Sequence, residues 1–443
     1  MGTLITLGQF FLSLSILVIL HECGHFFPAK WFKTKVEKFY LFFDPGFSLF
    51  KYKKGETEYG IGWLPFGGYV KIAGMIDESF DKEQMAGPVQ DWEFRAKPAW
   101  QRLIIMLGGV TVNFILGILI FACMFLKWGD IYLPNENAKY GIAVEELGHN
   151  LGLQDGDKLI SVGDTKIDKL YPNDLSREIV INEARTIQVE RSGSIITLTI
   201  DDETAQSLAT YENKDKLVYT PRMPVVIARL AEDMPAAQAG LQVEDQILSI
   251  NGQSVFFYDQ FNRVAADLAD KQADITYLRG QDTSSLQLSF NENGKLGFNP
   301  YSWGRFFDAE RTQYGFNDAL VAGWDRSFGF LGNQLKAFGQ MFRGKLKVSE
   351  SVGGPVAIAG MFGPTWDWRQ FWNLTASLSI ILAFMNLLPI PGLDGGHVIF
   401  LLWEIITGRK ASDRVVEYAT LVGFILLISL MVFIFWIDLS RLF

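Results

Sequence analysis

Four long apolar runs predict four membrane-spanning helices. The first covers about residues 4–27, the second about 103–126 and the fourth about 416–437. The third region, about 371–406, is interrupted by the segment NLLPIPGLDGG. Each complete run approaches the roughly 20 residues that a helix needs to cross a bilayer. A polar stretch of about 240 residues separates the second and third runs, which indicates a membrane protein with a large extramembrane insert.

Basic residues cluster beside the apolar runs and predict the orientation of the chain. They lie after the first run, before the second, and between the third and fourth: Lys30, Lys33, Lys35, Lys38, Lys51, Lys53, Lys54, Arg95, Lys97, Arg102, Arg409, Lys410 and Arg414. By the positive-inside rule both connectors are cytoplasmic, so the termini and the insert lie on the outer face. No Lys or Arg precedes Lys30 and no small-residue cleavage site follows, so we interpret the first run as a retained helix.

The insert contains an internal repeat. Residues 151–167 read LGLQDGDKLISVGDTKI, and residues 239–255 read AGLQVEDQILSINGQSV. Self-similarity of this kind predicts two copies of one small domain. The pattern resembles a PDZ domain, with late strands at 197–200 and 286–290.

Two further segments have clear periodicity. Residues 59–72, YGIGWLPFGGYVKI, alternate around a Pro-Phe-Gly-Gly turn and predict a membrane-associated β-hairpin in the cytoplasmic connector. Residues 316–342 carry apolar side chains at helical spacing and predict an amphipathic helix.

The first apolar run ends in HECGH, a motif of ionisable side chains that points to a metal site. On a helix, His21 and His25 project from one face, as a metal site requires. Glu22 is placed to take a proton from water at the metal. The alternative is a pair of interfacial histidines, but three ionisable groups in five residues of an apolar span favour a functional site.

A catalytic zinc site needs a third protein ligand and one open position. Asp394 in the interrupted third region is the first candidate, because a carboxylate there must be neutralised or bound. His397 is its rival, and the alternative for Asp394 is a helix N-cap. His149 lies in the insert, on the wrong side.

The prolines that interrupt the third region predict a broken helix beside the site. Pro389 and Pro391 free backbone carbonyls, which is tolerable near protein or a wet cavity. Asn386 is placed to donate to a peptide carbonyl or to an oxyanion; the alternative is a bond to the broken helix. Cys23 lies roughly opposite His21 on the helix and is not expected to be a ligand.

Charge and cysteine content exclude other classes. The net charge of −9 argues against nucleic-acid binding. The two cysteines, Cys23 and Cys123, cannot form a disulfide framework or a CxxC site.

These residues resemble the site-2 protease family of intramembrane zinc metalloproteases, in its RseP-like branch with tandem PDZ domains. The resemblance covers nearly the whole chain and rests on five segments: HECGH, FGGYVK at 66–71, Asn113, GGPVAI at 353–358 and NLLPIPGLDGGH at 386–397. Two departures stand out. Gly109 and Val110 replace the usual Gly-Pro pair, and the segment 76–96 is longer and more acidic than expected.

The resemblance implies a zinc-dependent metalloendopeptidase of the bacterial cytoplasmic (inner) membrane, with its active site toward the cytoplasm. His21, His25 and Asp394 would bind Zn²⁺, with Glu22 as general base and Asn386 on the substrate backbone. The hairpin would pair with an unwound substrate, through Gly60, Gly62, Phe66, Gly67, Gly68 and Tyr69. Substrates would be single-pass membrane proteins already cut by another protease, of the anti-sigma-factor or signal-peptide-remnant type, with the PDZ domains gating access.

The expected fold class is an α-helical polytopic membrane protein with two inserted PDZ-like α+β domains. The expected boundaries are 1–127 for the first membrane part, 128–215 and 216–300 for the two PDZ-like domains, 301–365 for an amphipathic helical linker and 366–443 for the second membrane part. Two other functions remain open: a non-enzymatic membrane scaffold whose PDZ domains bind C-terminal tails and which holds a structural metal, and an ion or metabolite transporter, since broken helices also occur there.

Overall fold

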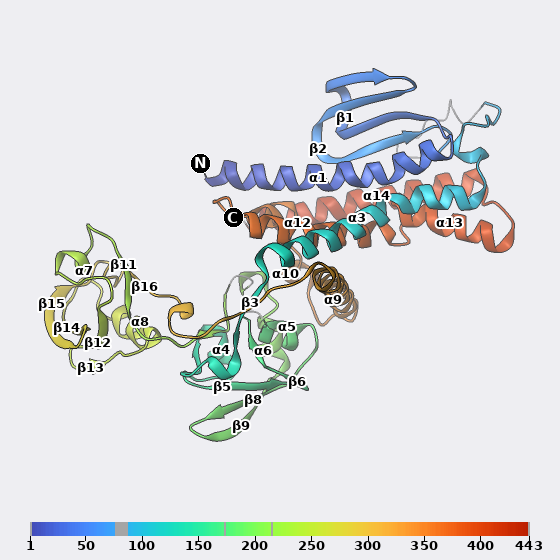
Figure 1. Ribbon diagram of the computed structural model, residues 1–443. Coiled ribbons are helices and arrows are strands. Elements are labelled where there is room, and N and C mark those ends of the chain that lie inside the picture. The colour runs from blue at the N-terminus through green and yellow to red at the C-terminus, as the bar shows by residue number, and fades with distance from the viewer. Residues whose placement is uncertain (1, 76–86, 172–173, 214–215, 442–443) are drawn as a thin grey trace. The chain divides into compact units, whose positions relative to one another are not determined.

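The chain divides into two compact units (Figure 1). The computed structural model describes residues 2–75, 87–171, 174–213 and 216–441. One unit comprises Met1–Gly129, Gln313–Leu335 and Val352–Phe443, and the other comprises Asp130–Thr312 and Lys336–Ser351. Of the segment 76–96 that the sequence singles out, residues 76–86 lie outside the described part.

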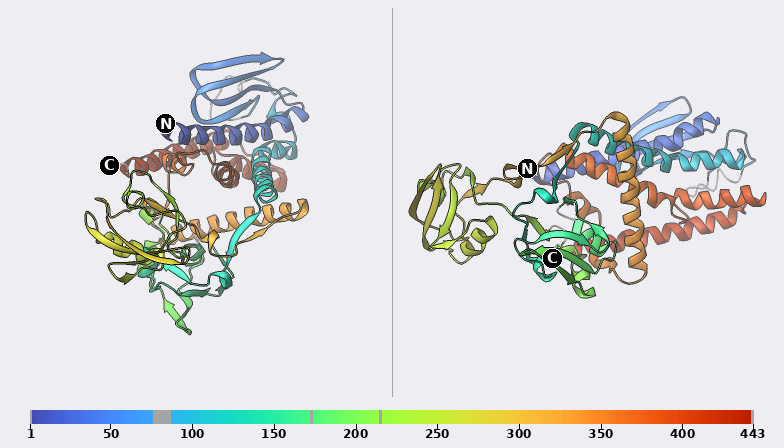
Figure 2. Two further views of the ribbon diagram at one scale, coloured as in Figure 1. Left: turned by 60° about the vertical axis from the view of Figure 1, so that its left-hand side comes forward. Right: turned by 60° about the horizontal axis from the view of Figure 1, so that its bottom comes forward.

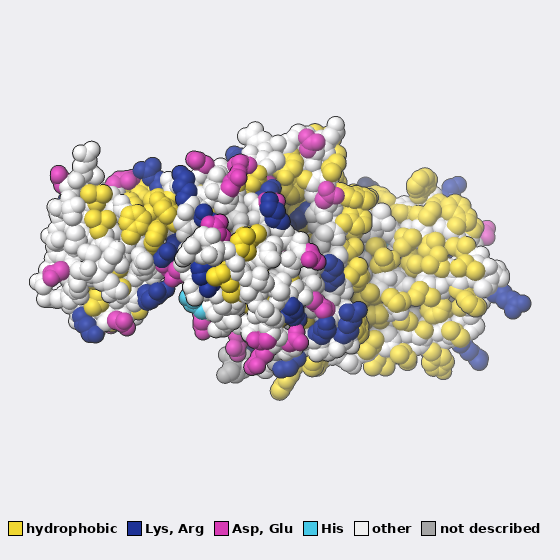
Figure 3. Space-filling view, turned by 90° about the horizontal axis from the view of Figure 1, so that it is seen from below, with side chains coloured by type: hydrophobic (Ala, Val, Ile, Leu, Met, Phe, Trp, Pro, Cys, Tyr) yellow, Lys and Arg dark blue, Asp and Glu magenta, His cyan; other side chains and the backbone are white. Residues whose placement is uncertain are grey.

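Helices of the first unit confirm the predicted spans. Among the described residues, four helices are long and apolar enough to cross a bilayer: α1 (Gly2–Trp31), α3 (Ala99–Trp128), α12 (Trp368–Leu387) and α14 (Asp413–Ser440). The third region is broken as expected, with α13 (Asp394–Thr407) following α12. Hydrophobic side chains cover much of the face of this unit seen in Figure 3. The fold is that of a polytopic membrane protein.

Helices α1 and α3 approach each other closely at two glycines. A Cβ built on Gly24 would lie 2.6 Å from the carbonyl carbon of Gly108, and one on Gly108 would lie 2.7 Å from that of Gly24. Small residues let helix backbones meet in a membrane, where dispersion and close packing drive association. This contact brings the HECGH turn of α1 directly against α3.

The sheet formed by the residues that follow α1 and precede α3 in the sequence differs from the predicted hairpin. Strand β1 (Val36–Lys54) pairs with β2 (Thr57–Ile72), and the strands lie beside α1 (Figures 1 and 2). Lys38 is paired with both Glu58 and Lys71. The segment around Lys38 therefore separates the two arms of residues 59–72, and the prediction that these arms pair with each other is wrong. Alternation indicates extended backbone but does not identify the partner strand.

In the second unit, two four-stranded sheets have corresponding orders. The first runs β6 (Thr165–Lys166), β5 (Lys158–Val162), β8 (Thr186–Arg191), β9 (Ser194–Thr199). The second runs β13 (Gln253–Ser254), β12 (Gln246–Ile250), β14 (Gln272–Arg279), β15 (Asp282–Ser289). Arg191 pairs with buried Asp157, and Arg279 pairs with buried Asp245, each at 2.7 Å.

Two predicted boundaries are wrong in this unit. Strand β10 (Tyr219–Pro221) pairs with β4 (Ile142–Val144), and Tyr219 belongs to the first hydrophobic core, so a boundary at 215/216 cuts that core. Strand β17 (Glu310–Thr312) pairs with β3 (Asp130–Pro134) and is not part of a helical linker. Strands of three residues are too short to show alternation, which is why the sequence conceals them.

The predicted amphipathic helix is α9 (Phe316–Phe342), with the expected bounds. The GGPVAI segment anchors the last span: buried Asp438 of α14 accepts hydrogen bonds from the backbone N–H groups of Gly354 and Val356, each at 2.9 Å. The remaining elements are η1 (Phe94–Ala96), η2 (Asn135–Asn137), α4 (Glu146–Asn150), β7 (Lys169–Leu170), α5 (Asp174–Val180), α6 (Asp202–Ser207), η3 (Tyr211–Asn213), β11 (Ile227–Leu230), α7 (Pro235–Gln238), α8 (Tyr258–Ala266), β16 (Phe298–Pro300), η4 (Trp303–Arg305), α10 (Val348–Ser351) and α11 (Pro355–Gly360).

Candidate active site

The HECGH turn lies inside α1, which continues without a break to Trp31. His21 and His25 are four residues apart and share a face of the helix. Both are buried, as is Glu22, with exposed fractions of 8%, 7% and 8% for His21, His25 and Glu22. Three buried ionisable groups on one apolar helix are costly unless they bind something or one another.

The broken third region brings Asp394 to the same place. Helix α12 ends at Leu387, six residues follow, and α13 begins at Asp394. The N-cap of α13 is Leu393, which makes no side-chain capping bond. The reading of Asp394 as an N-cap residue is therefore wrong, although its charge is favourably placed at the positive end of the helix dipole.

Three potential ligand atoms converge between these elements. The Nε2 atoms of His21 and His25 are 3.2 Å apart, and they lie 3.4 Å and 3.3 Å from Oδ2 of Asp394. A tetrahedral zinc ion with bonds of about 2.0–2.1 Å has ligand atoms about 3.3–3.4 Å apart. The buried Asp394 Oδ2 has no hydrogen-bond partner within the described part of the chain. The residues fit a divalent metal with one open position.

Helix α3 supports the two histidines from behind. Nδ1 of His25 lies 2.8 Å from the backbone oxygen of Ile105, and Nδ1 of His21 lies 3.2 Å from the side-chain amide of Asn113. Gly109 lies between them: a Cβ there would overlap Nε2 of His25 and come within 2.6 Å of Cε1 of His21. The glycine thus leaves room for both rings against the helix.

A cavity of about 250 Å³ opens beside the converging atoms. The sheet contributes Gly67, Gly68 and Tyr69 to its lining, and the broken region contributes Asn386 and His397. The phenol of Tyr69 donates to Asp44 Oδ1 at 2.8 Å. Burial, together with this hydrogen bond, raises the pKa of Tyr69, so its phenol stays neutral.

Glu22 also lines this cavity, together with Val70 of β2. The acid next to the ligand positions therefore shares this cavity with the strand. Its position allows it to exchange a proton with a group bound in the cavity.

The structure brings most of the candidate residues together. His21, Glu22, His25, Asp394, Asn386, Gly67, Gly68 and Tyr69 all line the cavity. Nδ2 of Asn386 lies 3.3 Å from Nε2 of His21. His397 lines the cavity, but it does not belong to the group of converging ligand atoms, and neither do Cys23 and His149.

Two hairpin glycines are placed elsewhere. A Cβ on Gly60 would meet the ring of Tyr40, and one on Gly62 would lie 2.6 Å from the backbone oxygen of Phe42. Neither position has room for a side chain, so packing within the sheet explains both glycines. The side chain of Phe66 lies outside the described residues.

Sequence reasoning missed Ile105, and it noted Gly109 and Asn113 only for the family resemblance, with no role in the site. Ile105, Gly109 and Asn113 follow one another at intervals of four along α3. That spacing is visible in the sequence, but a backbone carbonyl and a missing side chain carry no chemical signature.

Comparison with known proteins agrees with this geometry. The profile of peptidase family M50 matches residues 9–430. The chain is 29% identical to the regulator of sigma-E protease RseP of Escherichia coli over 455 residues, covering 98% of both chains. It is 27% identical to the regulator of sigma E protease of Haemophilus influenzae, covering 100% of both, and 26% identical to a putative zinc metalloprotease of Treponema pallidum, covering 97% of this chain and 98% of that one.

A match over nearly the full length decides between the open functions. It favours the enzyme over a scaffold or a transporter, and it identifies zinc as the metal. The chain belongs to peptidase family M50, the site-2 protease family of membrane zinc metalloproteases.

Proposed function

We propose that the protein is an intramembrane endopeptidase that cleaves the transmembrane segments of single-pass membrane proteins. The observation that carries this proposal is the convergence of His21, His25 and Asp394 between two apolar helices, with Glu22 in the same cavity. A peptide bond can reach this site only from a substrate that enters the membrane domain. Substrates of the anti-sigma-factor or signal-peptide-remnant type fit this requirement, and the names of the sigma-E protease relatives favour the first.

His21, His25 and Asp394 are the residues that would hold the zinc ion. Bound zinc supplies a Lewis acid that polarises a peptide carbonyl and lowers the pKa of water toward neutrality. Glu22 takes the proton as water attacks the carbonyl carbon, and returns it to the departing amine as the C–N bond breaks. Asn386 donates its Nδ2–H to the carbonyl oxygen as negative charge develops there.

The substrate would bind as an added strand on β2. Residues 68–72 pair on one side with the segment that contains Lys38, and Gly67, Gly68 and Tyr69 line the cavity. A helix hides its amide groups, whereas pairing with a strand edge holds a substrate extended and exposes the scissile bond. Because Val70 and Glu22 line the same cavity, strand addition would bring the substrate next to the general base.

Replacing Gly109 with alanine should disable the site without removing a ligand. The added Cβ overlaps His25 and lies 2.6 Å from Cε1 of His21, so at least one ring must move. Misplacing a reacting group by about 1 Å costs roughly 10²-fold in rate, and we expect a loss of activity of at least that size, together with weaker zinc binding.

Gly117→Ala is the matched control, because it lies on the same helix and its Cβ would come within 2.5 Å of Ile380 Cδ1, away from the ligands. Cleavage rate and zinc content are measured for both variants. Equal losses in the two would show that general packing of α3 explains the effect.

We infer that the insert holds two PDZ-like domains that gate access to the site. The corresponding strand orders and the corresponding pairs Arg191–Asp157 and Arg279–Asp245 support two copies of one domain. Their bounds are about 130–223 and 224–300, with residues 301–312 packing on the first. Paired domains on the outer side would exclude substrates whose outer part has not been shortened by another protease.

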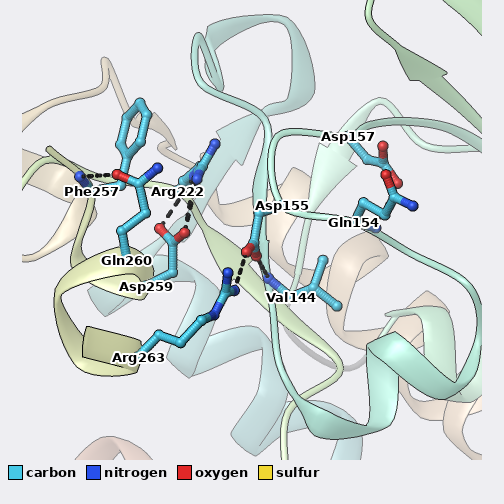
Figure 4. Close-up of polar contacts among 9 residues, drawn as sticks. All are labelled: Val144, Gln154, Asp155, Asp157, Arg222, Phe257, Asp259, Gln260 and Arg263. Carbon is cyan, nitrogen blue, oxygen red and sulfur yellow. Dashed lines mark hydrogen bonds and ion pairs between the residues drawn. The ribbon is translucent and has the colours of Figure 1, made fainter. Parts of the chain in front are cut away.

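Arg222 joins the two PDZ-like domains (Figure 4). Its backbone N–H donates to Gly141 of the first domain at 3.0 Å, while its guanidinium binds Asp259 of the second at 2.9 Å. The guanidinium also stacks 4.1 Å from the ring centre of Phe257. A second pair, Arg263 with Asp155, lies at 2.5 Å. These contacts would keep the domains in a fixed relation.

We expect alanine substitution of Arg222 and of Arg263 to have different effects. The side chains of Arg222 and Asp259 are 13% and 9% exposed, so Arg222→Ala leaves a buried carboxylate unpaired, at a cost of about 2–5 kcal/mol. Arg263 is 64% exposed, and its pair is worth about 1 kcal/mol or less. We expect Arg222→Ala, and not Arg263→Ala, to broaden the distance between spin labels on the two domains. Equal broadening would contradict the role of Arg222.

The bacterial relatives favour the inner membrane of a bacterium, and the basic connectors favour an orientation with the site toward the cytoplasm and the insert outside. Accessibility of single cysteines introduced into the insert and into the connector near Lys53 tests this orientation.

The function is tested by metal removal with a defined substrate. Purified protein in detergent is incubated with a single-pass membrane protein whose outer part has been shortened. We expect cleavage within the membrane segment, loss of cleavage with a zinc chelator, and recovery when zinc is restored. Cleavage that survives chelation, or cuts only outside the membrane segment, would overturn the proposal.

A further inference from the structure

Three residues of α3 form one line against the two histidines of the site. Ile105, Gly109 and Asn113 are spaced by four, so they share a face of the helix. Gly109 leaves space for the rings, and the residues one turn before and after it contact their Nδ1 atoms. Ile105 and Asn113, at the two ends of this line, determine whether each histidine is protonated on Nδ1 or on Nε2.

The proton of His25 is fixed by geometry. Its Nδ1 lies 2.8 Å from the backbone oxygen of Ile105. A carbonyl oxygen only accepts, so Nδ1 carries the hydrogen and Nε2 keeps a lone pair. That lone pair points to the place where the three ligand atoms converge.

The proton of His21 depends on the orientation of Asn113. This asparagine is fully buried, and in the structure its Nδ2 lies 3.2 Å from Nδ1 of His21. Its Oδ1 has no hydrogen-bond partner among residues 2–75, 87–171, 174–213 and 216–441. The contact with His21 is thus the one that selects between the two orientations, which differ by a half-turn of the amide.

Only one orientation suits a metal. With the NH₂ group facing Nδ1, as the amide is drawn in the structure, the proton of His21 would lie on Nε2, which is 3.4 Å from Asp394 Oδ2 and 3.2 Å from His25 Nε2. That hydrogen would occupy the position where the ligand atoms converge. If the carbonyl oxygen faces Nδ1, the proton is on Nδ1 and Nε2 offers its lone pair, as metal-binding histidines do.

We propose that Asn113 is a positioning residue for zinc: with its amide turned by a half-turn from the orientation in the structure, its Oδ1 accepts the Nδ1–H of His21, as the Ile105 carbonyl accepts that of His25. Helix α3 thereby fixes the tautomer and orientation of both rings. This inference rests on the proposed zinc site and adds to it a residue that is not a ligand.

The first test compares zinc affinities of the full chain in detergent by chelator competition. Asn113→Leu removes the acceptor, and we expect affinity to fall about 10–100-fold. Asn113→Asp retains an acceptor and should bind zinc at least as well as Asn113. Ser379→Ala is the control, because Ser379 donates to the backbone oxygen of Asn113 at 2.7 Å and is equally buried, yet does not touch His21. It should keep wild-type affinity.

The second test reads the tautomer directly and does not depend on the folding of Asn113→Leu. The chain has only four histidines, so ¹⁵N labelling of their rings gives few signals. In the zinc-bound protein, His21 should carry its proton on Nδ1, and Asn113→Asp should shift that proton to lower field without moving the signal of His25.

The outcomes separate the two claims. A wild-type chain that binds no zinc contradicts the proposed site. A wild-type chain that binds zinc, with equal affinity in Asn113→Leu, or with His21 unmoved in Asn113→Asp, contradicts the role of Asn113 alone. Spectroscopy of the cobalt-substituted protein provides the same comparison of ligand geometry without measuring catalysis.

Discussion

Glu22→Gln is expected to lower the cleavage rate by about 10²–10⁴-fold while zinc content stays at the wild-type level. The substitution keeps the size and shape of the side chain. It removes the ability to take a proton from water and return it to the amine. The carboxylate of Glu22 is not one of the three converging ligand atoms, so the metal should remain.

Glu56→Gln is the matched control for this charge change. Glu56 lies in the turn between β1 and β2, and its partially exposed carboxylate pairs with Lys30. Cleavage by this variant should equal that of the wild type. Substantial cleavage by Glu22→Gln with zinc bound would show that another group moves the proton.

The membrane helices were predictable because bilayer thickness imposes a length on the apolar runs. The sheet before α3 was not, since the strand pattern of residues 59–72 gives no sign that the segment around Lys38 lies between its arms. The boundary near residue 215 failed for a related reason: Tyr219 completes the first core through a strand of only three residues.

The site was predictable to the extent that its chemistry lies in side chains. HECGH and Asp394 carry ligand types that are costly inside a membrane, so each signals a function alone. The contributions of α3 were hidden because Ile105 acts through its backbone and Gly109 through the space it leaves. For Gly60 and Gly62 the sequence suggested a role in substrate binding, whereas the packing of the sheet is sufficient to explain both glycines.

Asp394→Asn is expected to abolish zinc binding. We expect the variant to be at least as stable as the wild type without zinc, and less stable than the wild type when zinc is present. Without zinc, Asp394 is a buried carboxylate whose Oδ2 has no hydrogen-bond partner within the described chain. Two neighbouring imidazoles offset its charge only when protonated. Replacing the carboxylate with a neutral amide should therefore leave the metal-free protein as stable as the wild type or more so.

When zinc is present, the wild type should be more stable than Asp394→Asn. A ligand that binds only the folded state stabilises it by about 2.7 kcal/mol at 100 times its dissociation constant, so the wild-type Tm should rise as zinc is added. The Tm of Asp394→Asn should not respond, because two neutral histidines are a poor site for a divalent ion. His397→Gln distinguishes the rival ligand three residues later. If zinc raised the Tm of Asp394→Asn but not of His397→Gln, the third ligand would be His397, and the convergence of atoms at Asp394 would need another explanation.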